Sequence, residues 1–166
     1  MVGLAAGRGP SREKLAWELL QSVKDPEIPT ISVLELGLIR SVQEGPSGLL
    51  VELMPTFLGC PAIEAMQQMI REQLAQLGPI QVKLVTDEPW TTSRISEEGR
   101  EKLRGSGFAP PPRGDSLELH VLQAHARCPY CDSDDTTLEN SFGPTLCRAV
   151  HYCNACRSQF EQFKAI

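Results

Sequence analysis

Cysteines are the residues of this 166-residue chain whose type and spacing are best suited to chemistry. Cys128 and Cys131 form one Cys-x-x-Cys pair near the C-terminus, and Cys153 and Cys156 form a second. Cys60 stands far from both pairs, in the stretch MPTFLGCPAIEAM. The two pairs indicate a metal site, whereas the isolated thiol is either a small buried side chain or a group that reacts or binds metal.

Two Cys-x-x-Cys pairs are a common source of four thiolate ligands for zinc. Each pair supplies two ligands of a tetrahedron from one tight turn, and a hairpin can bridge residues 132–152 between them. We therefore expect one structural Zn²⁺ per chain, with no open coordination position for catalysis. An iron ion in the same rubredoxin-like site is the main alternative, because thiolates alone do not select the metal. Two disulfides are less compatible with the cytoplasmic location that we expect. The expected ligands are Cys128, Cys131, Cys153 and Cys156.

The other polar residues of this C-terminal segment are expected to lie outside the metal shell. Cys147 is interpreted as a packed or half-exposed thiol, which could replace Cys153 only by giving up the geometry of the Cys-x-x-Cys turn. Acidic residues outnumber basic ones in the segment, and four thiolates on one zinc add negative charge, so a nucleic-acid partner is not expected. Because four cysteines complete the shell, three histidines are expected to be ordinary ribbon residues: His120, His125 and His151.

Cys60 lies where a helix is expected to start. Proline is favoured at the first helical position, so Gly59-Cys60-Pro61 places the thiol at or next to the N-cap of a helix that runs to about Gln76. Free backbone amides and the helix dipole at that end favour an anion and lower the pKa of a thiol. A buried structural cysteine fits the same residues, and the local pattern leaves both interpretations open.

Four polar residues could converge with Cys60 at one end of a sheet. They are Asp25 and Glu27 in a turn, Glu35 in an apolar stretch, and Thr56 after a predicted strand. Together they would offer one soft and several hard ligands, which suits an iron ion bound in passing. Local capping and ordinary solvation are the alternatives for the acidic residues. The first half of the chain contains no histidine, so a Cys–His catalytic pair is not expected there.

The elements that must position these residues follow the order α-β-β-α-β-α. This order predicts a small α+β fold in which helices cover one sheet. Apolar periodicity predicts a helix capped by Ser11, a β-hairpin around Gly-Pro-Ser-Gly (45–48), a helix with apolar residues from 63 to 77, a strand over 80–84 and a helix over 93–104.

Composition divides the chain into two domains. We expect a disordered tail at 1–10, an α+β domain at 11–108, a proline-rich linker at 109–116 and a four-cysteine zinc ribbon at 117–166. The formal net charge of −5 argues against a general nucleic-acid binder. No apolar run reaches membrane-spanning length, so no membrane partner is expected.

Several motifs of the first half resemble the MIP18 (DUF59) family of iron–sulfur assembly factors. These stretches are DPEIPTISVLELGLI, PTFLGCPAIEAM and VTDEPWTTSRISEEGREKL. With GFAPP and the cysteine-rich segment added, nearly the whole chain resembles the PaaD/PaaJ-type family of phenylacetyl-CoA epoxidase systems. The family motifs fall on Asp25-Pro26-Glu27, Glu35-Leu36-Gly37, Thr56 with Gly59-Cys60-Pro61, and Trp90-Thr91-Thr92.

This resemblance implies an accessory factor of aerobic phenylacetate degradation that matures or delivers an iron–sulfur or iron centre. Cys60 would be the thiol that holds a cluster or an iron ion in transit. One thiolate cannot hold a cluster alone, so a homodimer or a client protein must complete the shell. The implied partners are components of the epoxidase complex, including its reductase. A non-catalytic structural component of the oxygenase is the alternative, and an independent thiol enzyme ranks last. The oxidation itself is not expected, because the sequence lacks the Glu-x-x-His pairs of a diiron carboxylate site.

Overall fold

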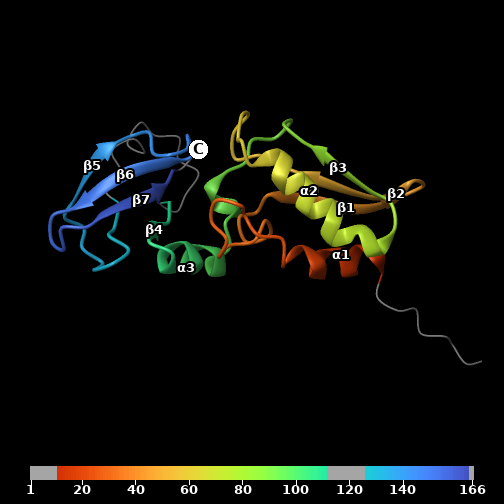
Figure 1. Ribbon diagram of the computed structural model, residues 1–166, viewed down its shortest axis with the longest axis horizontal. Helices are drawn as coiled ribbons and strands as arrows, with labels where there is room; N and C mark the ends of the chain where they lie inside the picture. The colour runs from red at the N-terminus through yellow and green to blue at the C-terminus, as the bar shows by residue number, and fades with distance from the viewer. Residues whose placement is uncertain (1–10, 112–125, 165–166) are drawn as a thin grey trace, which may run out of the picture.

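The computed structural model describes residues 11–111 and 126–164, which form two units placed side by side (Figure 1). The first unit comprises residues 11–107. The ribbon unit comprises residues 108–109 and 126–164. The expected disordered tail at 1–10, most of the expected linker, and His120 and His125 lie outside the described residues.

The first unit has the predicted α-β-β-α-β-α order. The strands form one sheet in which β1 and β2 are antiparallel and β2 and β3 are parallel. A parallel pair requires a crossover, and α2 supplies it. The elements are α1 (Arg12–Leu20), β1 (Ile39–Gly45), β2 (Gly48–Leu53), α2 (Ile63–Leu74), β3 (Ile80–Leu84) and α3 (Glu97–Gly105), with short 3-10 turns η1 (Ala75–Leu77) and η2 (Thr92–Arg94).

Local sequence signals explain the first elements. Ser11 caps α1, because its hydroxyl oxygen accepts a hydrogen bond from the backbone amide of Lys14 at 3.2 Å. Ala16 and Leu20 form the fully buried face of that helix. The hairpin pairs Val42 with Val51, as the alternation of apolar residues predicts.

The ribbon unit contains a four-stranded sheet in the order β4-β7-β6-β5. Its strands are β4 (Phe108–Ala109), β5 (Thr136–Asn140), β6 (Arg148–Cys153) and β7 (Gln159–Phe163). Strand β4 precedes the proline-rich segment, yet it pairs in parallel with β7. Residues 108–109, expected at the junction of domain and linker, therefore form an edge of the ribbon sheet. The ribbon has a small core of its own that includes Ala109, Cys128, Cys153 and Phe160.

The two units share a hydrophobic core. Phe163 and Cys147 belong to the ribbon unit but are buried with the aliphatic core of the first unit. The Phe163 ring meets Trp90 edge to face, with centroids 5.9 Å apart. The ribbon is therefore docked through apolar contacts, and its position determines which side chains reach the first unit. None of the helices in residues 11–111 and 126–164 has the length and apolar character required to span a membrane.

Candidate functional site

The two Cys-x-x-Cys segments adopt the same backbone conformation. In the first, the Cys128 amide donates to the Ser133 carbonyl at 3.0 Å, and the Asp132 amide donates to the Cys128 carbonyl at 3.0 Å. The second repeats the latter bond, from the Arg157 amide to the Cys153 carbonyl at 2.8 Å. Asp132 and Arg157 have φ values of 61° and 60°, so each turn closes through a left-handed residue. Sequence spacing predicts the cysteine pairs but not these turn-closing residues.

The four thiols of these turns converge on one point. Their sulfur atoms all lie within 4.8 Å of one another, with Cys128 and Cys156 Sγ atoms 3.7 Å apart and Cys131 and Cys153 Sγ atoms 3.5 Å apart. A Zn–S bond of about 2.3 Å in a tetrahedron requires a sulfur spacing of about 3.8 Å. The donor set therefore fits zinc.

The same thiols need a cation to remain ionised together. The Ser133 amide lowers the pKa of Cys131, but desolvation and hydrogen bonds to neighbouring cysteines outweigh it and raise the pKa to about 12. A bound divalent ion reverses this effect by stabilising the thiolates. Within residues 11–111 and 126–164, no other group of three or more His, Cys, Asp or Glu side chains is as compact.

Cys60 lies in the turn that precedes α2, not at the N-cap as predicted. The helix begins at Ile63 and its N-cap is Ala62, which makes no side-chain capping bond. The Cys60 carbonyl accepts a hydrogen bond from the Ile63 amide at 3.3 Å. Pro61 therefore occupies the turn rather than the first helical position, and the thiol is farther from the helix end than the sequence suggested.

The electrostatics of Cys60 also differ from the prediction. Burial raises the pKa of the Cys60 thiol, and only the Ala62 backbone amide opposes that rise appreciably. The charges of Cys147, Glu27 and Asp25 raise the pKa further. The prediction of a thiolate stabilised by the helix end is therefore wrong. The group is a neutral thiol at neutral pH, and a bound cation must displace its proton.

Cys60 opens into a small cavity between the two units. The cavity has a volume of about 20 Å³. Its polar lining brings together Asp25, Glu27, Thr56 and Cys60, four of the five residues that the sequence selected. The rest of the lining comprises Ile28, Leu36, Leu38, Met66, Cys147, Arg148 and Phe163.

The two acidic residues of the cavity are held by defined contacts. One Asp25 carboxylate oxygen accepts hydrogen bonds from the amides of Glu27 at 2.8 Å and Ile28 at 2.9 Å. Glu27 accepts a hydrogen bond from Arg148 of the ribbon at 3.1 Å. Each carboxylate has a second oxygen, so both residues can serve as hard ligands without losing these contacts.

Glu35 does not join the cavity, contrary to the expectation that it would converge with Cys60. Its carboxylate accepts hydrogen bonds from the Ser32 amide at 2.7 Å and from the Lys102 ammonium group. It lines a separate cavity of about 430 Å³. Desolvation alone would raise the pKa of Glu35, but Lys102 and Ser32 lower it below its usual value. These contacts assign Glu35 a structural role at the junction with α3.

Two further family motifs brace each other beside the cavity. The Trp90 indole donates to the Leu36 carbonyl at 2.9 Å, and Arg94 Nε donates to the Gly37 carbonyl at 3.0 Å. Gly37 has φ = +67°, and a Cβ there would overlap the Arg94 carbonyl oxygen. Only glycine fits this approach. The Glu-Leu-Gly and Trp-Thr-Thr segments therefore fix the position of Leu36 in the cavity wall.

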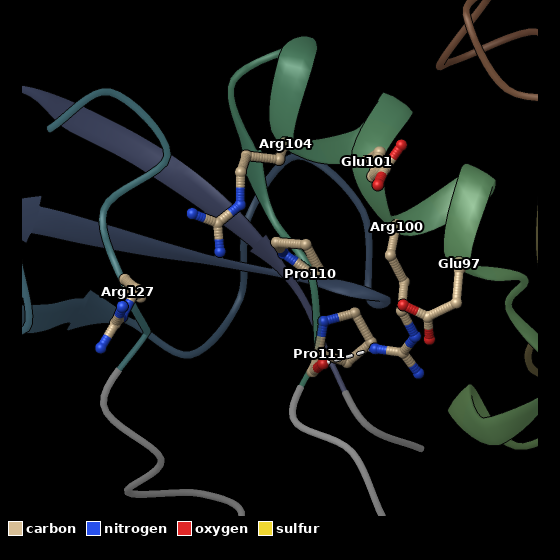
Figure 2. Close-up of a pocket in the computed structure, with 7 residues that line it drawn as sticks. All are labelled: Glu97, Arg100, Glu101, Arg104, Pro110, Pro111 and Arg127. Carbon is tan, nitrogen blue, oxygen red and sulfur yellow. Dashed lines mark hydrogen bonds between the residues drawn. The ribbon is translucent and has the colours of Figure 1, made fainter. Parts of the chain in front are cut away.

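A larger cavity of about 360 Å³ lies between α3 and the ribbon (Figure 2). Arg100 donates to the carbonyls of Thr92 and Pro111, the latter shown by the dashed line in Figure 2. Arg104 and Arg127 both bind the Asp132 carboxylate. These cationic groups are engaged by protein acceptors, so the cavity is a weaker candidate than the one at Cys60.

The sequence did not identify Cys147 and Arg148 as site residues. Cys147 is 6% exposed and Arg148 is 7% exposed, and both face the first unit from the start of β6. The signal available in the sequence was that Cys147 remains after the four zinc ligands are assigned. The docking of the ribbon, which places that thiol opposite Cys60, has no local signature.

Two protein families match separate parts of the chain. Residues 14–86 match the family described as iron–sulfur cluster assembly protein. Residues 113–164 match the PaaD zinc beta ribbon domain. The first match contains Asp25, Glu27, Thr56 and Cys60, and the second contains all four convergent cysteines.

The chain is also similar to a protein over nearly its full length. It is 41% identical over 152 residues to a protein of Escherichia coli (strain K12) that is named as one of the subunits of 1,2-phenylacetyl-CoA epoxidase. The aligned region covers 90% of this chain and 91% of that relative.

Solved structures resemble the first unit. A DUF59 domain from Bacillus anthracis is 23% identical, covers 55% of this chain and 91% of its own, and gives a TM-score of 0.48. A conserved hypothetical protein of Thermotoga maritima is 25% identical, covers 59% of this chain and 97% of its own, and gives a TM-score of 0.46.

Proposed function

Because the chain belongs to the PaaD-type family of 1,2-phenylacetyl-CoA epoxidase subunits, we propose that it is an accessory factor of aerobic phenylacetate degradation. It matures or delivers an iron–sulfur or iron centre for the epoxidase complex. The observation that carries the proposal is the cavity in which Cys60 meets Asp25, Glu27 and Thr56, within the segment that matches iron–sulfur cluster assembly proteins.

The composition of the cavity suits temporary binding of iron. A thiolate is a soft ligand and carboxylates are hard ligands, and ferrous iron accepts both. The raised pKa of Cys60 means that the thiol is protonated when no metal is bound, so loss of the metal is coupled to uptake of a proton. Within the described part of the chain, the ligand atoms around Cys60 do not form a compact set of three. Such an incomplete shell favours transfer over storage.

The ribbon has a different role in this proposal. Its four cysteines hold one structural Zn²⁺, which would supply folding energy to a unit with a small core. Four protein ligands leave no open position, so the zinc takes no part in a reaction. The protein is then an assembly factor and not the enzyme that oxidises the aromatic substrate.

The proposed partners are the components of the epoxidase complex, including its reductase. The chain itself would act as a homodimer in the cytoplasm, so that a second copy or the client completes the iron shell. Size-exclusion chromatography with light scattering, at several protein concentrations, tests the dimer directly.

Reconstitution of the epoxidase tests the proposed function. Epoxidase components would be matured with the wild-type chain, with Cys60→Ala, and with Glu64→Ala as an exposed control near the start of α2. The expected result is a loss of iron or cluster content and of epoxidase activity with Cys60→Ala alone. Undiminished content and activity with that variant would rule the proposal out.

A non-catalytic structural role in the oxygenase is the second candidate, because the Escherichia coli relative is named as one of the epoxidase subunits. That role predicts a stable stoichiometric complex with the epoxidase components. It also predicts that neither the complex nor its activity depends on Cys60.

A further inference from the structure

Cys147 extends the site at Cys60 into the ribbon unit. Its thiol is 6% exposed and lines the same cavity, although it belongs to the segment that binds zinc. The Cys147 sulfur lies 3.1 Å from the Thr145 hydroxyl oxygen, which holds it in place. The backbone there is also fixed, because the Cys147 carbonyl accepts a hydrogen bond from the Lys164 amide at 2.9 Å. The cavity therefore contains two positioned thiols, one from each unit.

Arg148 supplies an independent observation that a ligand belongs in this cavity. One terminal nitrogen of its guanidinium donates to Glu27 at 3.1 Å and the other donates to Glu161 at 3.2 Å. Its Nε atom is buried and has no hydrogen-bond partner among the described residues. A buried donor without an acceptor destabilises the fold. A thiolate bound to a metal would supply an acceptor on the side of the cavity.

The size of the cavity restricts what can bind there. A volume of about 20 Å³ is close to the space of one water molecule. A single ion fits that space, whereas a preassembled iron–sulfur cluster does not. The Asp25 and Glu27 carboxylates face the same volume and favour a divalent cation over an anion.

We propose that Cys60 and Cys147 together bind the iron that the protein transfers, as a single Fe²⁺ ion held between the two units. This inference rests on the proposed function. Binding forms two Fe–S bonds and releases one proton from each thiol to solvent, with no change in oxidation state. Asp25 or Glu27 supplies an oxygen ligand, and Arg148 stabilises the negative charge of the thiolates. The ribbon is thus part of the transfer site as well as a zinc-stabilised domain.

Anaerobic titration with Fe²⁺ tests the inference on the full-length zinc-loaded protein. Equilibrium dialysis gives the affinity, and X-ray absorption at the iron edge counts sulfur neighbours without interference from zinc. The wild type is expected to bind one Fe²⁺ with two sulfur neighbours. Cys60→Ser and Cys147→Ser are each expected to lose one sulfur neighbour and at least about tenfold in affinity. Cys147→Ala is included because alanine leaves a small apolar side chain in the buried position.

The zinc content serves as the control for folding and should remain at one per chain in every variant. If both Cys147 variants retain zinc and match the wild type in affinity and sulfur count, while Cys60→Ser does not, the inference is wrong and the proposed function stands. If the wild type itself binds no Fe²⁺, both fail. Loss of the sulfur neighbour in both Cys147 variants with zinc retained supports the two-thiol site.

Discussion

Arg148 of the ribbon donates a hydrogen bond to the Glu27 carboxylate of the first unit at 3.1 Å. The arginine is 7% exposed, and its guanidinium also lies over the Phe108 ring at 5.0 Å. This contact joins the zinc-binding unit to the turn that carries Asp25 and Glu27. The position of the ribbon and the composition of the Cys60 cavity are therefore linked through one side chain.

Arg148→Met should weaken the contact between the units. Methionine keeps part of the apolar stem but leaves Glu27 and Glu161 without their cationic partner, so we expect a loss of about 1–3 kcal/mol in the free energy of unfolding. Urea unfolding followed by circular dichroism measures it. Arg127→Met is the matched control, because Arg127 forms exposed ion pairs and should change stability little. Equal effects of the two variants would contradict the role given to Arg148.

Removal of zinc should release the ribbon from the first unit. Trp90 contacts Phe163 edge to face, so its fluorescence reports this docking. In a Trp17→Phe background, which removes the exposed second tryptophan, a strong chelator should change the Trp90 emission, and Cys153→Ser should reproduce the change with loss of zinc. Cys147→Ser should retain zinc. An unchanged Trp90 signal in zinc-free protein would show that the ribbon docks without its metal.

Gly37→Ala should be strongly destabilising. The position has φ = +67°, and the new Cβ would overlap the Arg94 carbonyl oxygen. We expect a loss of at least about 2 kcal/mol in the free energy of unfolding. Gly105→Ala, at the end of α3, is the control because nothing lies within 4 Å of a Cβ there. It should be neutral or slightly stabilising, and a similar loss in both variants would show that the close approach at Gly37 is not the cause.

The reactivity of Cys60 should follow its raised pKa. Burial favours the neutral thiol, so the thiolate fraction is lower than that of an ordinary cysteine at neutral pH and increases as pH rises through the raised pKa. Alkylation by iodoacetamide, followed by peptide mass spectrometry, should be slower at about pH 7.5 than for the unfolded chain and should accelerate above about pH 9. A rate that levels off below about pH 8 would indicate a stabilised thiolate instead.

Patterns of apolar residues predicted most of the fold. The order of the first unit, the hairpin, α2 and the Cys-x-x-Cys turns all follow from spacing, because each depends on neighbouring residues. The start of α2 was misplaced, since proline also fits the turn before a helix, where Pro61 lies. The participation of β4 in the ribbon sheet was missed because a two-residue strand carries no periodicity.

The candidate site was predicted in part for the same reason. Asp25, Glu27, Thr56 and Cys60 were selected individually, and the fold brings them together at one cavity. Glu35 was selected on equal grounds, but Lys102 from α3 holds it elsewhere. Cys147 and Arg148 reach the cavity only through the docking of two units, which depends on long-range packing and not on local sequence.

The central claim is that Cys60 binds iron in transit, and the metal content of anaerobically purified protein tests it most directly. Wild-type protein from iron-replete cells should contain one zinc per chain and additional iron. Cys60→Ala should retain the zinc and lose the iron. Iron content that is the same in both proteins, with equal zinc, would contradict the account.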